Sequence, residues 1–323
     1  FFLLSYLFVY KFRMILASDG DRSPFYQTCV KRCMNSNCTK DNNFTPEAAE
    51  LLDFSSWLLQ WGCRDECRYQ CMWRTVDAFA ERGYDLPKFH GKWPFARVLG
   101  VQEPASALAS LLNLAGHVYM HYDLTTQFSV KTAPLLLFWY GFAMVCENAW
   151  VWSVIFHTRD TPFTEFMDYA CALSMVMALL AAAIVRSHCR PWPAIRMKLS
   201  LCAPRRAAPD MWVYYKEHNV NISLQIVRSP VGVLGGALWT LWAGAALARG
   251  ARHTARLLAF ALWSGAALAL ELLDFAPRAG CDAHALWHLA TAPLPLLFYR
   301  YVTVRAVKHF TTKHSAKDDI KLS

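Results

Sequence analysis

Apolar runs of about twenty residues recur along the chain after residue 100, and that is the length an α-helix needs to cross a bilayer. Hydrophobic residues make up 55% of the 323-residue chain. Charged residues make up only 18%, below the roughly 25% of soluble domains. The sequence therefore predicts an all-α, polytopic membrane protein with a smaller N-terminal domain.

The expected membrane domain covers residues 103–308, and a cytosolic tail follows over 309–323. Its predicted spans lie at residues 105–118 (extending toward Tyr122, with His117 and His121), 134–156, 166–185, 230–248, 257–275 and 285–304. Lys and Arg cluster after residue 185, after residue 248 and in the tail, which marks these segments as cytosolic. With residues 18–102 in the lumen, one further crossing is needed within 190–229. Because no apolar run there is long enough, we expect this region to be the least well formed part of the membrane domain.

The N-terminal part of the chain carries the features of a secreted domain. Residues 1–17 begin with an apolar run too short to span, which we interpret as a signal peptide. Residues 18–102 then hold six of the eleven cysteines: Cys29, Cys33, Cys38, Cys63, Cys67 and Cys71. An even number in this context predicts three disulfides in an oxidising compartment. A zinc module is the alternative, although C-x3-C spacing without paired histidines fits it poorly. Glycosylation sequons at Asn37 and Asn43 agree with a lumenal location.

The net charge of +9 does not indicate a nucleic-acid partner. The Lys and Arg residues fall largely in loops and in the tail, where membrane topology accounts for them. No groove-like pattern of basic and aromatic residues accompanies them. We therefore expect contacts with membrane lipids and none with nucleic acid.

Polar side chains gather at the edges of two apolar runs. Ser153 and His157 are four residues apart, so they share one face of a helix, and Asp168 follows where the next run begins. Farther along the chain, His284 and His288 are again four apart. Two histidines at this spacing can bind one metal ion, and a third from another helix completes a three-histidine zinc site with an open position. On the predicted topology all five residues lie at the lumenal face.

Short motifs run in order through nearly the whole chain: GDRSPFYQTCVKRC, CRDECRYQCMW, FHGKWPFAR, QEPASA, NAWVWSVIFHTRDT, ELLDF and DAHALWH. Together they resemble the post-GPI-attachment-to-proteins factor three family. That family belongs to a superfamily of seven-helix membrane hydrolases that includes the alkaline ceramidases. The fold implied is a seven-helix bundle, whose fourth helix would fall in residues 190–229, the weakest part of the resemblance.

The resemblance also implies an activity. Members of the family remove the sn-2 acyl chain from the phosphatidylinositol of GPI-anchored proteins, in the Golgi or the endoplasmic reticulum, so this chain is expected to be a zinc-dependent phospholipase A2-type ester hydrolase. His157, His284 and His288 would bind Zn²⁺. Ser153 and Asp168 would act on the water that the zinc activates. GPI-anchored proteins and their lipid are the partners implied.

In the expected reaction Asp168 accepts the proton of the attacking water and passes it to the leaving alcohol, while Ser153 donates to the developing oxyanion. One alternative makes Ser153 a covalent nucleophile with His157 as its base, but this leaves His284 and His288 without a role.

Other acidic residues are candidates for orienting a histidine, namely Asp160 and Asp282, whereas Glu271 and Asp274 lie at the end of an apolar run without an assigned role. Two further function classes stay open. One is an amide hydrolase for ceramide-like lipids, and the other is a non-catalytic receptor or chaperone of GPI-anchored cargo.

Overall fold

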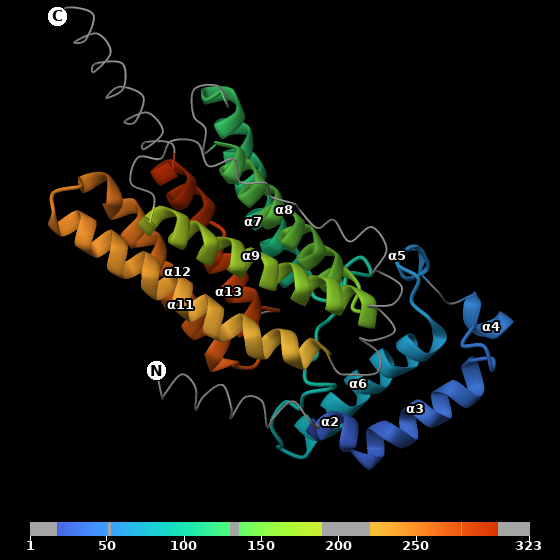
Figure 1. Cartoon of the computed structure of the whole chain (residues 1–323). Helices are drawn as coiled ribbons and strands as arrows, with labels where there is room; N and C mark the ends of the chain where they lie inside the picture. Colours follow the sequence, from blue (N-terminus) through green and yellow to red (C-terminus); the bar gives the residue numbers. More distant parts are fainter. Residues whose placement is uncertain (1–17, 51–52, 130–135, 189–219, 279, 303–323) are drawn as a thin grey trace, which may run out of the picture. The chain divides into compact units, whose positions relative to one another are not determined.

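The structure is a computed structural model, and the residues it describes are 18–50, 53–129, 136–188, 220–278 and 280–302 (Figure 1). Within these ranges the regular secondary structure is helical, with isolated β-bridges and no strands. The predicted signal peptide and cytosolic tail lie outside the described residues.

The chain divides into two compact units. The first consists of the chain up to Ala105, His157–Arg159 and Ala269–Leu286. The second consists of Ser106–Phe156, Asp160–Leu268 and the chain from Trp287 onward. Two short segments of the first unit, His157–Arg159 and Ala269–Leu286, come from the part of the sequence predicted as the membrane domain. They carry His157 and His284.

The helices of the first unit are mostly short: α2 (Asp19–Arg22), α3 (Pro24–Asn37), α4 (Pro46–Ala49), α5 (Phe54–Leu58) and α6 (Cys63–Glu81). Proline opens α3 and α4, a position where its missing N–H costs no hydrogen bond. Asp65 and Glu66 lie in the first turn of α6, where their negative charges interact favourably with the helix dipole and stabilise the helix.

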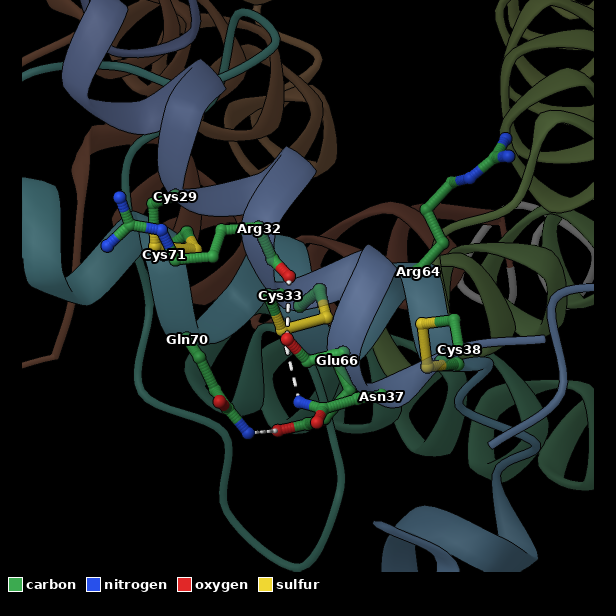
Figure 2. Close-up of a disulfide and its surroundings, with 12 residues drawn as sticks. Cys29, Arg32, Cys33, Asn37, Cys38, Arg64, Glu66, Gln70 and Cys71 are labelled. Atoms are coloured by element: carbon green, nitrogen blue, oxygen red, sulfur yellow. Dashed lines mark hydrogen bonds between the residues drawn. A yellow bond between two sulfur atoms is a disulfide. The ribbon is translucent and has the colours of Figure 1, made fainter. Parts of the chain in front are cut away.

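Three disulfides join α3 and α6 in the antiparallel sense: Cys29–Cys71, Cys33–Cys67 and Cys38–Cys63 (Figure 2). The helical spacing of Cys63, Cys67 and Cys71 places all three sulfurs on one buried face of α6. The prediction of three disulfides is therefore confirmed. The zinc-module alternative is wrong, because the six sulfurs are bonded to one another.

A tight turn after α6 joins residues 89 and 92. The backbone N–H of Phe89 donates to the carbonyl of Lys92 at 2.8 Å, and that of Lys92 donates back at 3.0 Å. The central residues, His90 and Gly91, have φ of 51° and 82°, the pair of positive values that defines a type I′ turn. The turn is anchored because the amide of Gly91 donates to Ser18 Oγ at 2.7 Å.

The long helices follow residue 103: α7 (Pro104–Gln127), α8 (Leu136–Thr158), α9 (Pro162–His188), α11 (Val220–Ala248), α12 (Ala255–Leu273) and α13 (Ala283–Thr291), with a one-turn helix η1 (Arg252–Thr254) before α12. Residues 294–302 are again helical. The predicted all-α membrane fold with a disulfide-rich N-terminal region is thus confirmed.

Three stretches in the described part are long and apolar enough to cross a bilayer: Pro162–Ile184, Val231–Ala248 and Arg252–Leu273. Helices α7 and α8 also have spanning length, 24 and 23 residues, and α7 has the lower hydropathy of the two. In α7 the cause is a buried polar stripe of Ser106, Ser110, Asn113 and His117. The predicted last span, 285–304, is interrupted after Thr291.

The span predicted at 230–248 is confirmed, because the stretch long and apolar enough to cross a bilayer is Val231–Ala248. The helix that carries this span, α11, begins earlier, at Val220. The remaining part of the expected fourth helix, residues 189–219, lies outside the described residues.

The core of the second unit is aromatic. Phe298 lies within 6 Å of the rings of Trp239, Phe142 and Phe260, with centroid distances of 5.7, 5.2 and 5.0 Å. The indole N–H of Trp239 donates to the carbonyl of Leu179 at 3.1 Å, which ties α11 to α9. A polar contact of this kind between membrane helices fixes their register where apolar packing alone does not.

Candidate metal centre

Helix α8 delivers two of the predicted site residues at its C-terminal end. Ser153 and His157 lie one turn apart, and both side chains are buried. The last carbonyls of a helix lack intrahelical partners. Here the amides of Gln102 and Glu103 donate to the carbonyls of Thr158 and His157, both at 3.0 Å. The backbone that carries His157 is therefore held in place.

A stack of aromatic and cationic groups fixes the same helix end. Arg159 pairs with Asp65 on α6 at 2.7 Å. Its guanidinium lies 3.8 Å from the ring centroid of Trp61, and that of Arg97 lies 3.4 Å from it. Arg97 in turn pairs with Glu66 at 2.7 Å. Cation–π contacts and charge-assisted hydrogen bonds thus join α6 to the segment that follows His157.

Helix α13 delivers the other two histidines. Its start is capped by Asp282, whose Oδ1 accepts from the amide of Ala285 at 2.8 Å. His284 and His288 follow on one face, one turn apart. Asp282, which the sequence suggested as a partner of a histidine, serves here as the helix cap. Burial raises the pKa of this carboxyl group, and its hydrogen bond with Ala285 counteracts part of that shift.

The three predicted ligands come together. Each of His157, His284 and His288 offers one ring nitrogen, and these nitrogens lie within 4.8 Å of one another. The rings of His157 and His284 have centroids 5.2 Å apart. Nitrogens bound to one tetrahedral zinc ion lie about 3.3 Å apart, so this set could hold a single ion after a small inward shift of the rings, with one position left open.

Glu103 orients His157, and sequence reasoning missed it. The Nδ1–H of His157 donates to Glu103 Oε2 at 2.7 Å, while Lys92 Nζ donates to the other carboxylate oxygen at 2.8 Å. Burial alone would raise the pKa of Glu103, but Lys92 and His157 outweigh it and hold this pKa far below its ordinary value. The carboxylate is therefore charged. Its sequence signal was weak: an acid immediately before the proline that opens α7.

Glu271 plays the same part for His284, whose Nδ1–H donates to Glu271 Oε2 at 2.7 Å. The sequence singled out Glu271 and Asp274 without a role. Asp274, which follows the end of α12, pairs with Lys88 at 2.6 Å across 186 residues of sequence. Of the two acids in the ELLDF motif, Glu271 thus binds a histidine of the site and Asp274 binds Lys88.

These contacts allow a test of whether the residues suit zinc. When a carboxylate accepts from Nδ1, the neutral ring leaves Nε2 as a lone-pair donor, and this pairing is the usual support of metal-bound histidines. Two of the three histidines have it. The third, His288, lies against the indole of Trp287, with ring centroids 4.7 Å apart, and its backbone carbonyl accepts from Asn113 at 2.7 Å. The donor set fits Zn²⁺.

Ser153 and Asp168 occupy different helices. The hydroxyl of Ser153 lies 3.0 Å from that of Ser110 on α7. Asp168 lies on α9, outside the three-histidine group. Their assignment to the chemistry rests on the resemblance and on their spacing.

Comparison with known proteins supports the resemblance. Residues 53–306 match the Per1-like family. The chain is 38% identical over 302 residues to Post-GPI attachment to proteins factor 3 of Drosophila melanogaster, covering 92% of each chain. Proteins called GPI-specific phospholipase A2-like PGAP3 are 37% identical over 305 residues in Danio rerio and 35% over 292 in Homo sapiens, covering 88% of this chain and 90% and 88% of theirs. No solved structure matches. The chain therefore belongs to the Per1-like family.

Proposed function

We propose that this protein is a zinc-dependent ester hydrolase that removes the sn-2 acyl chain from the phosphatidylinositol of GPI-anchored proteins. The observation that carries the proposal is the convergence of His157, His284 and His288, two of which are oriented by a carboxylate. The names of the relatives, GPI-specific phospholipase A2-like, supply the substrate and the type of bond.

The bound zinc would lower the pKa of a water molecule and polarise the ester carbonyl. Asp168 accepts the proton of the attacking water and returns it to the leaving alcohol. Ser153 donates to the developing oxyanion. Its neighbour Ser110 favours that role, because a hydrogen bond from Ser110 to Ser153 leaves the proton of Ser153 available for the substrate.

The proposed location is the lumenal face of the Golgi or the endoplasmic reticulum. Disulfides form in oxidising compartments, and three of them tie the first unit together. In the proposed arrangement residues 1–17 are a signal peptide, 18–102 a lumenal domain, 103–308 the membrane-embedded catalytic domain and 309–323 a cytosolic tail. The site then meets a lipid whose head group is in the lumen and whose acyl chains are in the bilayer.

Zinc analysis and lipid turnover by the purified protein test this proposal. We expect one zinc ion per chain and release of a fatty acid and a lysolipid from a GPI substrate. Cleavage of ceramide in preference to the GPI lipid would make the protein an amide hydrolase instead. Binding of GPI-anchored protein without any turnover by the zinc-loaded protein would make it a receptor or chaperone.

A further inference from the structure

A hollow of about 410 Å³ lies on the first unit. Its lining residues are distant in sequence from His157, His284 and His288. Helix α3 forms one wall, with Tyr26, Lys31 and the apolar side chains of Val30 and Met34. Arg68 on α6, His90 in the tight turn and Asp21 on α2 also border it. We call it the α3 hollow.

Lys31 and Arg68 border the α3 hollow together with one carboxylate, that of Asp21. Neither Lys31 nor Arg68 forms an ion pair with any residue in the described ranges, and Asp21 lies 3.7 Å from the ring of His90. Two cations against one carboxylate leave net positive charge at the edge of this concave surface, which favours an anionic ligand.

Tyr26 adds a hydroxyl donor to the α3 hollow. Its side chain is 5% exposed and packs on Phe89 at a centroid distance of 5.1 Å. Its hydroxyl makes no hydrogen bond with any described residue and is not among the fully buried polar atoms, so it is open to a partner from solution. Burial raises the pKa of Tyr26, partly offset by Arg68, so the hydroxyl stays protonated and can donate. It borders the α3 hollow, where a ligand would supply the acceptor.

We propose that the α3 hollow binds a phosphate group on the glycan head of the GPI lipid, through Lys31, Arg68 and the hydroxyl of Tyr26. This inference rests on the proposed function, which supplies a substrate with a sugar head group and phosphate. Cationic groups and an O–H donor are the partners that a phosphate oxygen accepts from. The apolar wall of Val30 and Met34 and the ring of His90 suit the faces of sugar rings.

The tight turn connects the α3 hollow with the metal centre. His90 borders the hollow, and Lys92, two residues later, pairs with Glu103, which accepts from His157. The amide of His90 also donates to Asp21, another residue of the hollow, at 3.4 Å. A head group held at the hollow therefore contacts the same four-residue turn that supports a metal ligand.

Binding by the full chain in detergent tests the proposal without relying on turnover. The probe is the soluble glycosylinositol phosphate head group, prepared without its lipid, and the protein carries His288→Ala so that hydrolysis plays no part. Arg68→Gln and Lys31→Gln should each weaken binding about tenfold, the effect of losing one hydrogen bond to a charged group. Tyr26→Phe keeps the ring and should weaken binding by several-fold. The matched control is Arg32→Gln, an exposed cation on α3 that does not border the hollow.

Two further probes distinguish the sources of phosphate. Inorganic phosphate should compete with the head group only weakly, because it lacks the sugars. Vesicles that contain phosphatidylserine should bind the four variants equally. Equal head-group affinity in all variants would overturn the proposal, as would vesicle binding that depends on Arg68 while the head group does not bind. Blocked cysteines in every variant would show that the first unit is still folded.

The outcome is separable from that of the proposed function. Head-group binding that depends on Lys31 and Arg68, in a protein that hydrolyses no GPI lipid, would support the proposed phosphate site and refute the proposed hydrolase activity. Hydrolysis of a GPI lipid by a protein whose Lys31 and Arg68 variants bind the head group normally would support the hydrolase activity and refute the phosphate site.

Discussion

The carboxylate of Glu103 joins Lys92 to His157, accepting from the first at 2.8 Å and from the second at 2.7 Å. All three residues belong to the first unit, which also holds the disulfides. The support of one proposed metal ligand, His157, is therefore built from the disulfide-rich part of the chain and from the residues just before α7.

Replacing Glu103 should weaken metal binding. Glu103→Gln retains an oxygen that accepts from His157 but removes the negative charge that makes the imidazole a stronger ligand. Loss of such a carboxylate typically costs about 10–100-fold in metal affinity. Zinc occupancy measured against a graded chelator reports the change. The control is Glu81→Gln, an exposed acid at the end of α6, and equal zinc affinity in both variants would contradict the role given to Glu103.

Removing a ligand should have a larger effect. In His284→Ala or His288→Ala only two histidines remain, so zinc content and release of fatty acid should fall together. His253→Ala is the matched control, because this histidine belongs to the second unit and lies outside the three-histidine group. Full zinc occupancy in both ligand variants would place the ion elsewhere.

Asp168→Asn should separate chemistry from metal binding. The amide keeps the shape of the side chain but does not accept a proton, so zinc should remain while turnover drops by roughly 10²–10⁴-fold, the usual scale of general acid–base catalysis. Zinc per chain and fatty-acid release are measured on the same sample. Near-normal turnover would remove Asp168 from the reaction, and loss of the metal would make it a ligand.

Thiol labelling of the unreduced protein should find all six cysteines of α3 and α6 blocked. Cys281, a partly exposed free thiol, should react and serves as the internal control. After reduction the six should label as well. Labelling of any of them before reduction would contradict the observed pairing.

Trp61 should contribute strongly to the stability of the first unit. It is 6% exposed, its indole N–H donates to the carbonyl of Gly100 at 3.0 Å, and two arginines lie against its ring. Trp61→Ala should destabilise the protein by about 3–5 kcal/mol, as for other buried aromatic residues. Thermal unfolding in detergent measures the loss. Trp57→Ala is the control, because Trp57 is 67% exposed, and an equal shift in both variants would refute the assignment.

The features that sequence alone predicted are those with local spacing. C-x3-C-x3-C in α6 and the four-residue intervals of His157 with Ser153 and of His284 with His288 each define one helix face, so the shared face of each set could be expected. The pairing of the cysteines could not be predicted, because it depends on α3 running antiparallel to α6. The role of Glu103 could not be predicted either, because its partner, His157, lies 54 residues away.

Hydropathy located the membrane span of α11 closely, since the apolar stretch there is Val231–Ala248. It did not reveal that the helix itself begins at Val220, because Arg228 and Ser229 interrupt the apolar run. It also counted α7 among the spans, although a buried polar stripe that includes Ser110 and Asn113 lowers the hydropathy of this helix.

The ion pair between Lys88 and Asp274 joins residues that are 186 positions apart. During synthesis the disulfide-bonded segment leaves the ribosome long before α12 and α13, which bring Glu271, His284 and His288. The first unit must therefore wait, incomplete, until nearly the whole chain has been inserted. A ribosome that stalls after α11 would release a product that contains His157 but neither His284 nor His288. On the proposed zinc site, metal loading would therefore be possible only after α13 has been synthesised.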